Sequence, residues 1–274
     1  MIMKNRPLIL VTNDDGIHSP GLYAAASTAA KTGDVLIAAP HTQQTGMGRS
    51  FPRCPDDGIL EKTAIPARML CEKIQCGEIR GYSVHGSPAL AVAHGVLEIA
   101  DRKPDLCISG INYGENLGTC LTCSGTLGAL FEAASYGIPG IAVSVEADLS
   151  EQHSEKFDEK NWTAAQEILE RYIRKVLEEG MPEGVDAWNI NVPDGLEYPY
   201  PVVRTIQSRQ NYFSFVRPKK RTYGKPYRLK SEKIVDMENL EWNSDIYAVY
   251  VDRIASATLL NFDMSVRFSE KERK

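Results

Sequence analysis

The stretch LILVTNDDGIHSPGL, residues Leu8–Leu22, indicates the fold class of this chain. Its first four residues are all apolar, which predicts a strand buried on both faces, as in a parallel sheet. The polar run Asn13–Asp15 follows at once. Gly16 permits a turn with positive φ, and Ser19-Pro20 supplies an N-cap followed by a proline at the first helical position. We therefore expect a strand, a polar loop and a helix.

The neighbouring carboxylates of Asp14 and Asp15 point to chemistry in this loop. Ligands of open α/β sheets bind outside the carboxyl ends of the strands, where this pair is expected to lie. Two adjacent carboxylates repel each other unless a cation lies between them. A plain turn is the alternative, because Asn and Asp are common in turns. We favour a metal site.

The next 180 residues alternate between apolar runs and helical patterns. This order predicts an α/β protein with a Rossmann-like, doubly wound, mostly parallel sheet. Residues 1–200 are expected to form the catalytic core, and residues 201–274 a C-terminal extended β arm with returning strands, involved in oligomerisation. The expected strands after the first are Asp34–Ala39, Gly81–Val84, Leu106–Ile108, Gly140–Val145, Ala187–Val192, Ile246–Val251 and Ala255–Leu260, and the expected helices are 22–31, 88–99, 127–136 and 162–177.

Polar loops follow the second strand and the strand at Leu106–Ile108. The first, Thr42–Ser50, is rich in hydroxyl groups and glycine, so it suits either a phosphate or a flexible surface loop. The second, Ser109–Gly118, contains three glycines and two asparagines, which indicates close backbone approach to a ligand. Ser124-Gly125-Thr126 then offers N–H donors at a helix start, where an anion fits, although Ser124 also suits an ordinary cap.

Composition places the chain among soluble globular proteins. It has 274 residues, 43% hydrophobic and 24% charged, and no apolar run approaches the roughly 20 residues of a membrane helix. We expect a cytoplasmic protein that does not bind membranes. The net charge of −5 argues against a stable nucleic-acid complex.

The cysteines and histidines carry weaker signals. Six cysteines in this length favour a reducing compartment. Cys120 and Cys123 have Cys-x-x-Cys spacing, which suits zinc or redox chemistry, but the pair is isolated, so we interpret both as thiols without a role. His85 and His94 lack a His or Cys partner at metal-ligand spacing and are interpreted as a turn residue and a helix residue.

The segment Arg204–Lys230 is basic, contains no acidic residue and carries interleaved aromatics. Such a segment can hold a nucleotide or a single strand by stacking and charge. The alternative is an extended arm that pairs with another subunit. Because Pro218 and Pro226 interrupt it and helical periodicity is lacking, we favour the arm.

Four motifs in this order give the chain a family resemblance: VTNDDGIHSPGL, AAP followed by Thr-Gly, SGINYGENLG and SGT. Together they resemble the survival protein SurE family of metal-dependent nucleotidases, from Leu8 to about Pro193. The resemblance implies a Rossmann-like core and hydrolysis of the phosphomonoester of nucleoside monophosphates, with short polyphosphate as a further substrate. It also implies a homodimer or homotetramer and one divalent cation per subunit.

The resemblance assigns roles to individual residues. It implies metal ligation by Asp14, Asp15, Thr45 and Asn112, and phosphate binding by Asn116, Ser124, Gly125 and Thr126. Many members carry serine where Thr45 stands; threonine keeps the oxygen. An all-oxygen ligand set favours Mg²⁺ or Mn²⁺ over Zn²⁺. Asp14 or Asp15 is the implied general base.

Three other functions compete with this one. An aspartyl-phosphate phosphatase requires Asp-x-Asp, and Asn13 stands where its nucleophile is needed. A non-catalytic, receiver-like Mg²⁺ switch also uses paired acidic residues, but it needs no Ser-Gly-Thr phosphate loop. A general acid phosphatase with a non-nucleotide substrate shares the reaction. Steady release of phosphate from nucleotides separates an enzyme from a switch.

Overall fold

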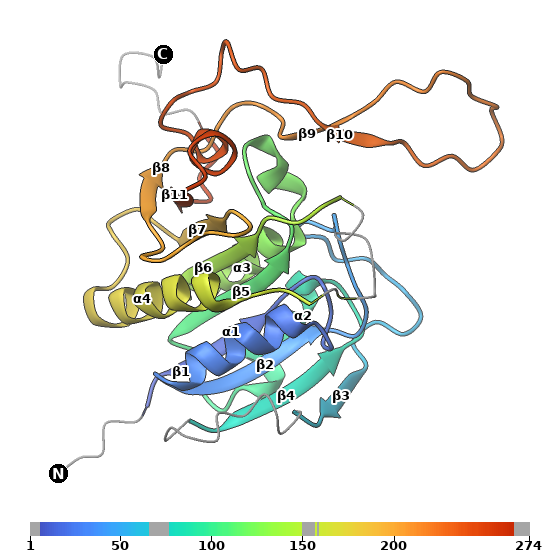
Figure 1. Ribbon diagram of the computed structural model, residues 1–274. Helices are drawn as coiled ribbons and strands as arrows, with labels where there is room; N and C mark the ends of the chain where they lie inside the picture. The colour runs from blue at the N-terminus through green and yellow to red at the C-terminus, as the bar shows by residue number, and fades with distance from the viewer. Residues whose placement is uncertain (1–5, 66–76, 150–156, 158, 266–274) are drawn as a thin grey trace, which may run out of the picture.

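The computed structural model describes residues 6–65, 77–149, 157 and 159–265. Its centre is a nine-stranded sheet with the order β3-β4-β2-β1-β5-β6-β7-β11-β8 (Figure 1). The strands are β1 (Leu8–Thr12), β2 (Asp34–Pro40), β3 (Leu60–Thr63), β4 (Ile79–Val84), β5 (Leu106–Tyr113), β6 (Gly140–Val145), β7 (Ala187–Val192), β8 (Val202–Thr205) and β11 (Ala255–Leu260). All neighbours pair in parallel except β3 with β4 and β11 with β7. The predicted doubly wound, mostly parallel sheet is confirmed.

The strand order reverses at β1. The chain runs outward from β1 to β2 and β4 on one side, and later from β5 to β6 and β7 on the other. Such a reversal opens a crevice at the carboxyl ends of the two central strands, which is where ligands of this architecture bind. The loops that follow β1 and β5 are therefore the ones placed for function.

Helices cover both faces of the sheet (Figure 1). On one face α1 (Pro20–Ala30) and α4 (Thr163–Glu179) pack against β1, β5 and β6. On the other face lie α2 (Pro88–His94), with the π-helical turn η2 (Gly95–Ile99) that follows it, and α3 (Gly125–Ser135). None of the helices in the described ranges is long and apolar enough to cross a membrane.

The C-terminal part adds strands to this sheet and a hairpin outside it. β8 and β11 extend the sheet beyond β7, while β9 (Phe213–Phe215) and β10 (Ser231–Lys233) pair antiparallel and carry a long loop away from the body (Figure 1). The extended arm predicted for Arg204–Lys230 thus contains this projecting loop. The division at residue 200 stays a prediction about folding units.

The strand predicted at Ile246–Val251 is wrong, because this segment is the helical turn η4 (Tyr247–Val251). Ser244 and Asp245 begin the helix: the Ser244 hydroxyl accepts from the Tyr247 N–H at 3.2 Å. Ile246 and Val249 both enter a small core around Tyr212 and Leu117, a spacing of three that suits a helix. The short apolar run alone does not distinguish the two structures.

Gly21 in α1 allows the helix to lie close to β5. A Cβ at this position would overlap the carbonyl oxygen of Ile111 in β5. We expect Gly21→Ala to destabilise the protein by about 1–3 kcal/mol through overpacking, which exceeds the gain of about 1 kcal/mol in helix propensity. Denaturant unfolding measures the difference. Glu167→Ala at an exposed position of α4 is the control, with an expected change within about 0.5 kcal/mol; an equally stable Gly21→Ala variant would contradict the close contact.

Candidate active site

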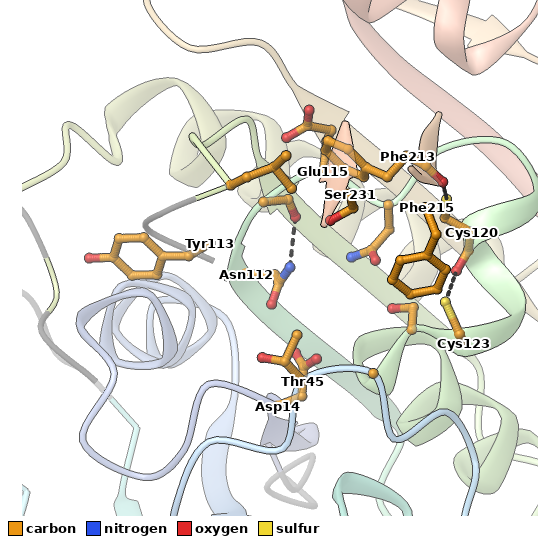
Figure 2. A pocket seen from close by; sticks show the side chains of 15 residues that line it. Asp14, Thr45, Asn112, Tyr113, Glu115, Cys120, Cys123, Phe213, Phe215 and Ser231 are labelled. Atoms are coloured by element: carbon orange, nitrogen blue, oxygen red, sulfur yellow. Dashed lines mark hydrogen bonds between the residues drawn. The ribbon is translucent and has the colours of Figure 1, made fainter. Parts of the chain in front are cut away.

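A cavity of about 270 Å³ lies at the carboxyl ends of β1 and β5. Asp14 and Thr45 form one side, Asn112 to Asn116 another, and the hairpin strands β9 and β10 contribute a third (Figure 2). Of the residues predicted for metal and phosphate binding, Asp14, Thr45, Asn112, Asn116 and Ser124 line this cavity. Residues that follow β1, β2 and β5 therefore meet at the point where the strand order reverses, together with residues of the hairpin strands.

Asp14 is held from two sides at the floor of the cavity. Its carboxylate Oδ1 accepts a hydrogen bond from the Thr126 hydroxyl at 2.8 Å, and its carbonyl oxygen accepts from the Gln44 N–H at 2.7 Å. A Cβ at position 125 would come within 2.7 Å of the Asp14 Cβ, so Gly125 lets α3 begin directly beside this side chain. Asp14 thus links the β1 loop to the β2 loop and to α3.

Asp15 lies next to Asp14 but does not line the cavity. Its Oδ2 accepts from the Tyr113 N–H at 3.1 Å and its Oδ1 from the Gln43 amide at 3.4 Å. Gly16 has φ +98° and is closed into the turn by Asn13, whose side chain both donates to the Gly16 carbonyl and accepts from its N–H. Asn13 therefore shapes the loop that presents the two carboxylates.

The two carboxylates are buried together, and their hydrogen bonds come from neutral groups. Burial raises the pKa of Asp14 to about 6, and burial together with repulsion by Asp14 raises the pKa of Asp15 to about 8. A divalent cation relieves both effects, because it favours the charged form of each group. The donor set fits a hard cation: two carboxylates lie near an amide and a hydroxyl.

Thr45 lies beside Asp14 at the lower part of the cavity, and Asn112 faces both of them (Figure 2). The Asn112 amide nitrogen donates to the Gly114 carbonyl at 2.6 Å. This bond uses the nitrogen and leaves the side-chain oxygen on the side of Asp14 and Thr45 (Figure 2). A register shift in β5 lies between Gly110 and Asn112, and such bulges re-aim side chains next to active sites.

The predicted phosphate-binding residues lie around the start of α3. Ser124 is its N-cap and accepts from the Leu127 N–H at 3.2 Å, so its hydroxyl serves the cap. The first N–H groups of a helix have no partner within it and form its positive end. Asn116 donates through its side chain to the Ser144 hydroxyl at 3.0 Å, while its backbone bonds Asn189 and Asn191. Asn116 is thus rigidly placed.

Sequence reasoning did not assign the hairpin residues to this cavity. Phe213 and Phe215 of β9 and Ser231 of β10 line it. Lys233 anchors the hairpin base, with Nζ 3.2 Å from the fully buried Glu115 carboxylate and 3.2 Å from Glu146. The interleaved aromatics of Arg204–Lys230 were the available signal, under the nucleotide-holding alternative.

Cys120 and Cys123 also line the cavity, as free thiols. The Cys123 thiol donates to the Cys120 carbonyl at 3.2 Å, and desolvation raises the pKa of Cys123. A raised pKa disfavours the reactive thiolate. Cys123 therefore contributes a neutral thiol to the cavity wall.

Fold and site together define an α/β protein with a buried acidic pair and the start of a helix side by side at the switch point of its sheet. The family model "Survival protein SurE" matches residues 9–215. The chain is 38% identical to the 5'-nucleotidase SurE of Methanosarcina mazei, over 97% of each protein, and 34% identical to that of Thermococcus kodakarensis, over 96% of each. The crystal structure of the SurE protein from Aquifex aeolicus superposes with a TM-score of 0.70 at 29% identity, covering 94% of this chain and 95% of that one. The chain belongs to the SurE family.

We expect Asp15→Asn to stabilise the metal-free protein. The folded state holds the Asp15 proton up to a pKa of about 8, far above the unfolded value of about 3.9, so the charged pair lowers stability as pH rises between these values. Removing one charge relieves roughly 1 kcal/mol or more, which raises Tm by about 2–4 °C at pH 8. Thermal melts in chelator at pH 5 and pH 8 measure this.

Thermal melts with added Mn²⁺ serve as the control. Added Mn²⁺ should raise the Tm of the unmodified protein and leave that of Asp15→Asn nearly unchanged. A variant that is less stable than the parent in chelator at pH 8 would show that hydrogen bonding by the carboxylate stabilises the metal-free loop more than its repulsion with Asp14 destabilises it.

Proposed function

We propose that the protein is a divalent-metal-dependent 5'-nucleotidase that hydrolyses nucleoside monophosphates to nucleoside and phosphate. The observation that carries this proposal is the buried Asp14–Asp15 pair, of which Asp14 shares a cavity with Thr45 and Asn112 beside the start of α3. The matched relatives, named 5'-nucleotidase SurE, support the reaction class.

The metal site consists of Asp14, Asp15, Thr45 and Asn112, and it takes Mg²⁺ or Mn²⁺. Carboxylate, amide and hydroxyl oxygens are the ligands that these hard ions prefer. When bound, the cation neutralises phosphate charge and lowers the pKa of water. The raised pKa values of both carboxyls are consistent with a site completed by positive charge.

The protein's own groups hold the phosphate and orient the water. The N–H groups of Gly125 and Thr126 at the start of α3 bind phosphate oxygens, and the helix dipole favours their negative charge. Ser124 fixes the cap, and Asn116 supports this corner through Ser144. Asp14 orients the attacking water and accepts its proton, because of the two carboxylates it is the one that lines the cavity.

The nucleoside is held by the hairpin side of the cavity. Phe213 and Phe215 present aromatic surface opposite the metal-binding side, and base–aromatic stacking is worth roughly 1–3 kcal/mol per base. Stacking tolerates different bases, so the expected substrates include purine and pyrimidine monophosphates. Short polyphosphate is proposed as a further substrate that uses the metal and α3 without this stacking.

A phosphate-release panel tests the function. The substrates are nucleoside 5'- and 3'-monophosphates, ribose 5-phosphate, p-nitrophenyl phosphate and short polyphosphate, each with Mg²⁺, Mn²⁺ or chelator. We expect metal-dependent turnover that favours nucleotides over ribose 5-phosphate. Equal turnover of nucleotides and of the base-free ribose 5-phosphate and p-nitrophenyl phosphate would favour the general phosphatase, and no turnover with any substrate would favour the switch.

Thr45 provides a test of the ligand set. We expect Thr45→Ser to retain most activity and Thr45→Ala to lose at least about tenfold in turnover and in Mn²⁺ affinity, because only the hydroxyl oxygen is needed. Phosphate release and Mn²⁺ titration measure the two effects. Thr42→Ala in the same loop is the matched control, and an alanine at position 45 that binds Mn²⁺ as tightly as threonine would remove Thr45 from the site.

We further propose that the protein is a cytoplasmic homodimer or homotetramer assembled through the β9–β10 hairpin. The hairpin leaves the body (Figure 1), and it exposes Phe215, Tyr223, Tyr227 and Leu229. Clustered exposed apolar side chains indicate an interaction surface. Because Phe213 at the hairpin base lines the cavity, assembly and substrate binding share one element.

Replacing residues 217–229 by an Asn-Gly turn tests this assembly. The replacement keeps β9, β10 and Lys233, so the cavity wall is retained, and we expect the mass in light scattering to fall to a smaller oligomer. The matched control is neutralisation of Lys219, Lys220 and Arg221 by glutamine in the full-length hairpin, which should keep the oligomer. An unchanged mass after the replacement would exclude the hairpin as the main contact.

A further inference from the structure

Two histidines and one glutamate form a cluster outside the cavity. One ring nitrogen of His41, one of His85 and one carboxylate oxygen of Glu61 all lie within 4.8 Å of one another. Glu61 Oε2 is 3.4 Å from His41 Nδ1 and 3.7 Å from His85 Nε2. In a tetrahedral zinc site the ligand atoms lie roughly 3.4 Å apart, so the Glu61 oxygen already stands near ligand spacing from both nitrogens.

The backbone holds these three side chains together. His41 directly follows β2 and His85 directly follows β4, two strands that pair in parallel, and the two imidazoles stack with centroids 4.2 Å apart. Glu61 belongs to β3 and pairs with Ser83 of β4. The His41 N–H donates to the Val84 carbonyl at 2.8 Å and the His85 N–H to the Ile59 carbonyl at 2.9 Å. The cluster is thus fixed by sheet hydrogen bonds.

His85 is oriented as a metal ligand. Its Nδ1 lies 3.1 Å from the Asp56 carboxylate, which fixes the ring and raises the pKa of His85. Its Nε2 is buried and has no hydrogen-bond partner among the described residues, although it is directed toward Glu61. A carboxylate on one ring nitrogen with the other directed at the ion is the arrangement found around ligating histidines.

We propose that His41, His85 and Glu61 bind a Zn²⁺ ion at a second metal site, separate from the acidic site. Two imidazole nitrogens and one carboxylate oxygen are typical zinc ligands, and they leave one position for water. Mg²⁺ prefers oxygen ligands and does not compete well here. Ion binding requires the partly exposed His41 ring to turn, so that its Nδ1 exchanges the Ser83 hydroxyl, 2.9 Å away, for the ion and part of its stacking contact with His85 is lost.

Zinc at this place stabilises the loop that completes the acidic site. His41 immediately precedes Thr42–Gly48, the loop that carries Thr45, Gln43 and Gln44. Gln43 contacts the Asp15 carboxylate and the Gln44 N–H donates to the Asp14 carbonyl. Fixing His41 to β3 and β4 therefore fixes the start of the β2 loop, so the second ion has a structural role.

Zinc titration of the untagged protein tests the proposal. The metal-free protein is titrated with Zn²⁺ against a chromophoric chelator in saturating Mg²⁺, and Co²⁺ is substituted to follow its visible ligand-field spectrum. We expect one tight equivalent in the parent protein and in Asp15→Asn, which lacks the acidic site. His41→Asn and His85→Asn should each weaken binding at least 100-fold, and Asp56→Asn about tenfold.

His94→Asn is the matched control, because His94 is also half-buried and pairs with a single carboxylate, Glu98, at 3.2 Å. It should keep the tight site. Circular dichroism verifies that each variant is folded, and Asp56→Asn, which alters no proposed ligand, still reports on the site if a histidine variant fails to fold. Unchanged zinc affinity in folded His85→Asn, or loss of the tight equivalent in Asp15→Asn, would overturn the second site.

Discussion

The burial of two like charges at the end of β1 is the constraint on which the rest of this structure depends. Asp14 and Asp15 are 5% and 4% exposed, and each raises the cost of ionising the other. A helix start, a backbone N–H and two neighbouring loops converge on them with hydrogen-bond donors. These donors reduce the free-energy cost of the two charges without removing it, which is why a cation is proposed there.

The sheet topology brings the loops around Asp14 and Asp15 together. β1 lies between β2 and β5, so the loops after all three strands open on one edge. Glycines allow the close approach: Gly16 turns the β1 loop against the β2 loop, and Gly125 lets α3 begin against Asp14. The hairpin then closes the remaining side through Lys233, which pairs with the buried Glu115 of the β5 loop. The fold thus brings the acidic side and the aromatic side of one cavity together from distant parts of the chain.

Most of the core and the meeting of Asp14, Thr45 and Asn112 in one cavity could be predicted from sequence, because both depend on short-range patterns. The strand at Leu8–Val11 and the polar run after it are contiguous, and parallel strands bring such runs to one edge. The apolar run at Ile246–Val251 has no such internal signal, and its helical state comes from packing against Tyr212 and Leu117. The place of Phe213 and Phe215 in the cavity could not be predicted either. It depends on the ion pair between Lys233 and Glu115, which lie 118 residues apart in the sequence (from 115 to 233).

The cluster of His41, His85 and Glu61 could not be predicted from sequence either, because its residues are far apart along the chain. Spacing along the chain excludes a ligand pair for His85, since 44 residues separate it from His41 (from 41 to 85), yet the parallel pairing of β2 and β4 places the two imidazoles in stacking contact. Glu61 joins them through the antiparallel strand β3. The cluster of His41, His85 and Glu61 therefore lies at the same edge of the sheet as the oxygen donors around Asp14. The β2 loop connects the two groups of side chains. Under the proposal of a second site, the two donor sets prefer different ions, and the β2 loop between them would carry order from the histidine cluster to Asp14 and Asp15.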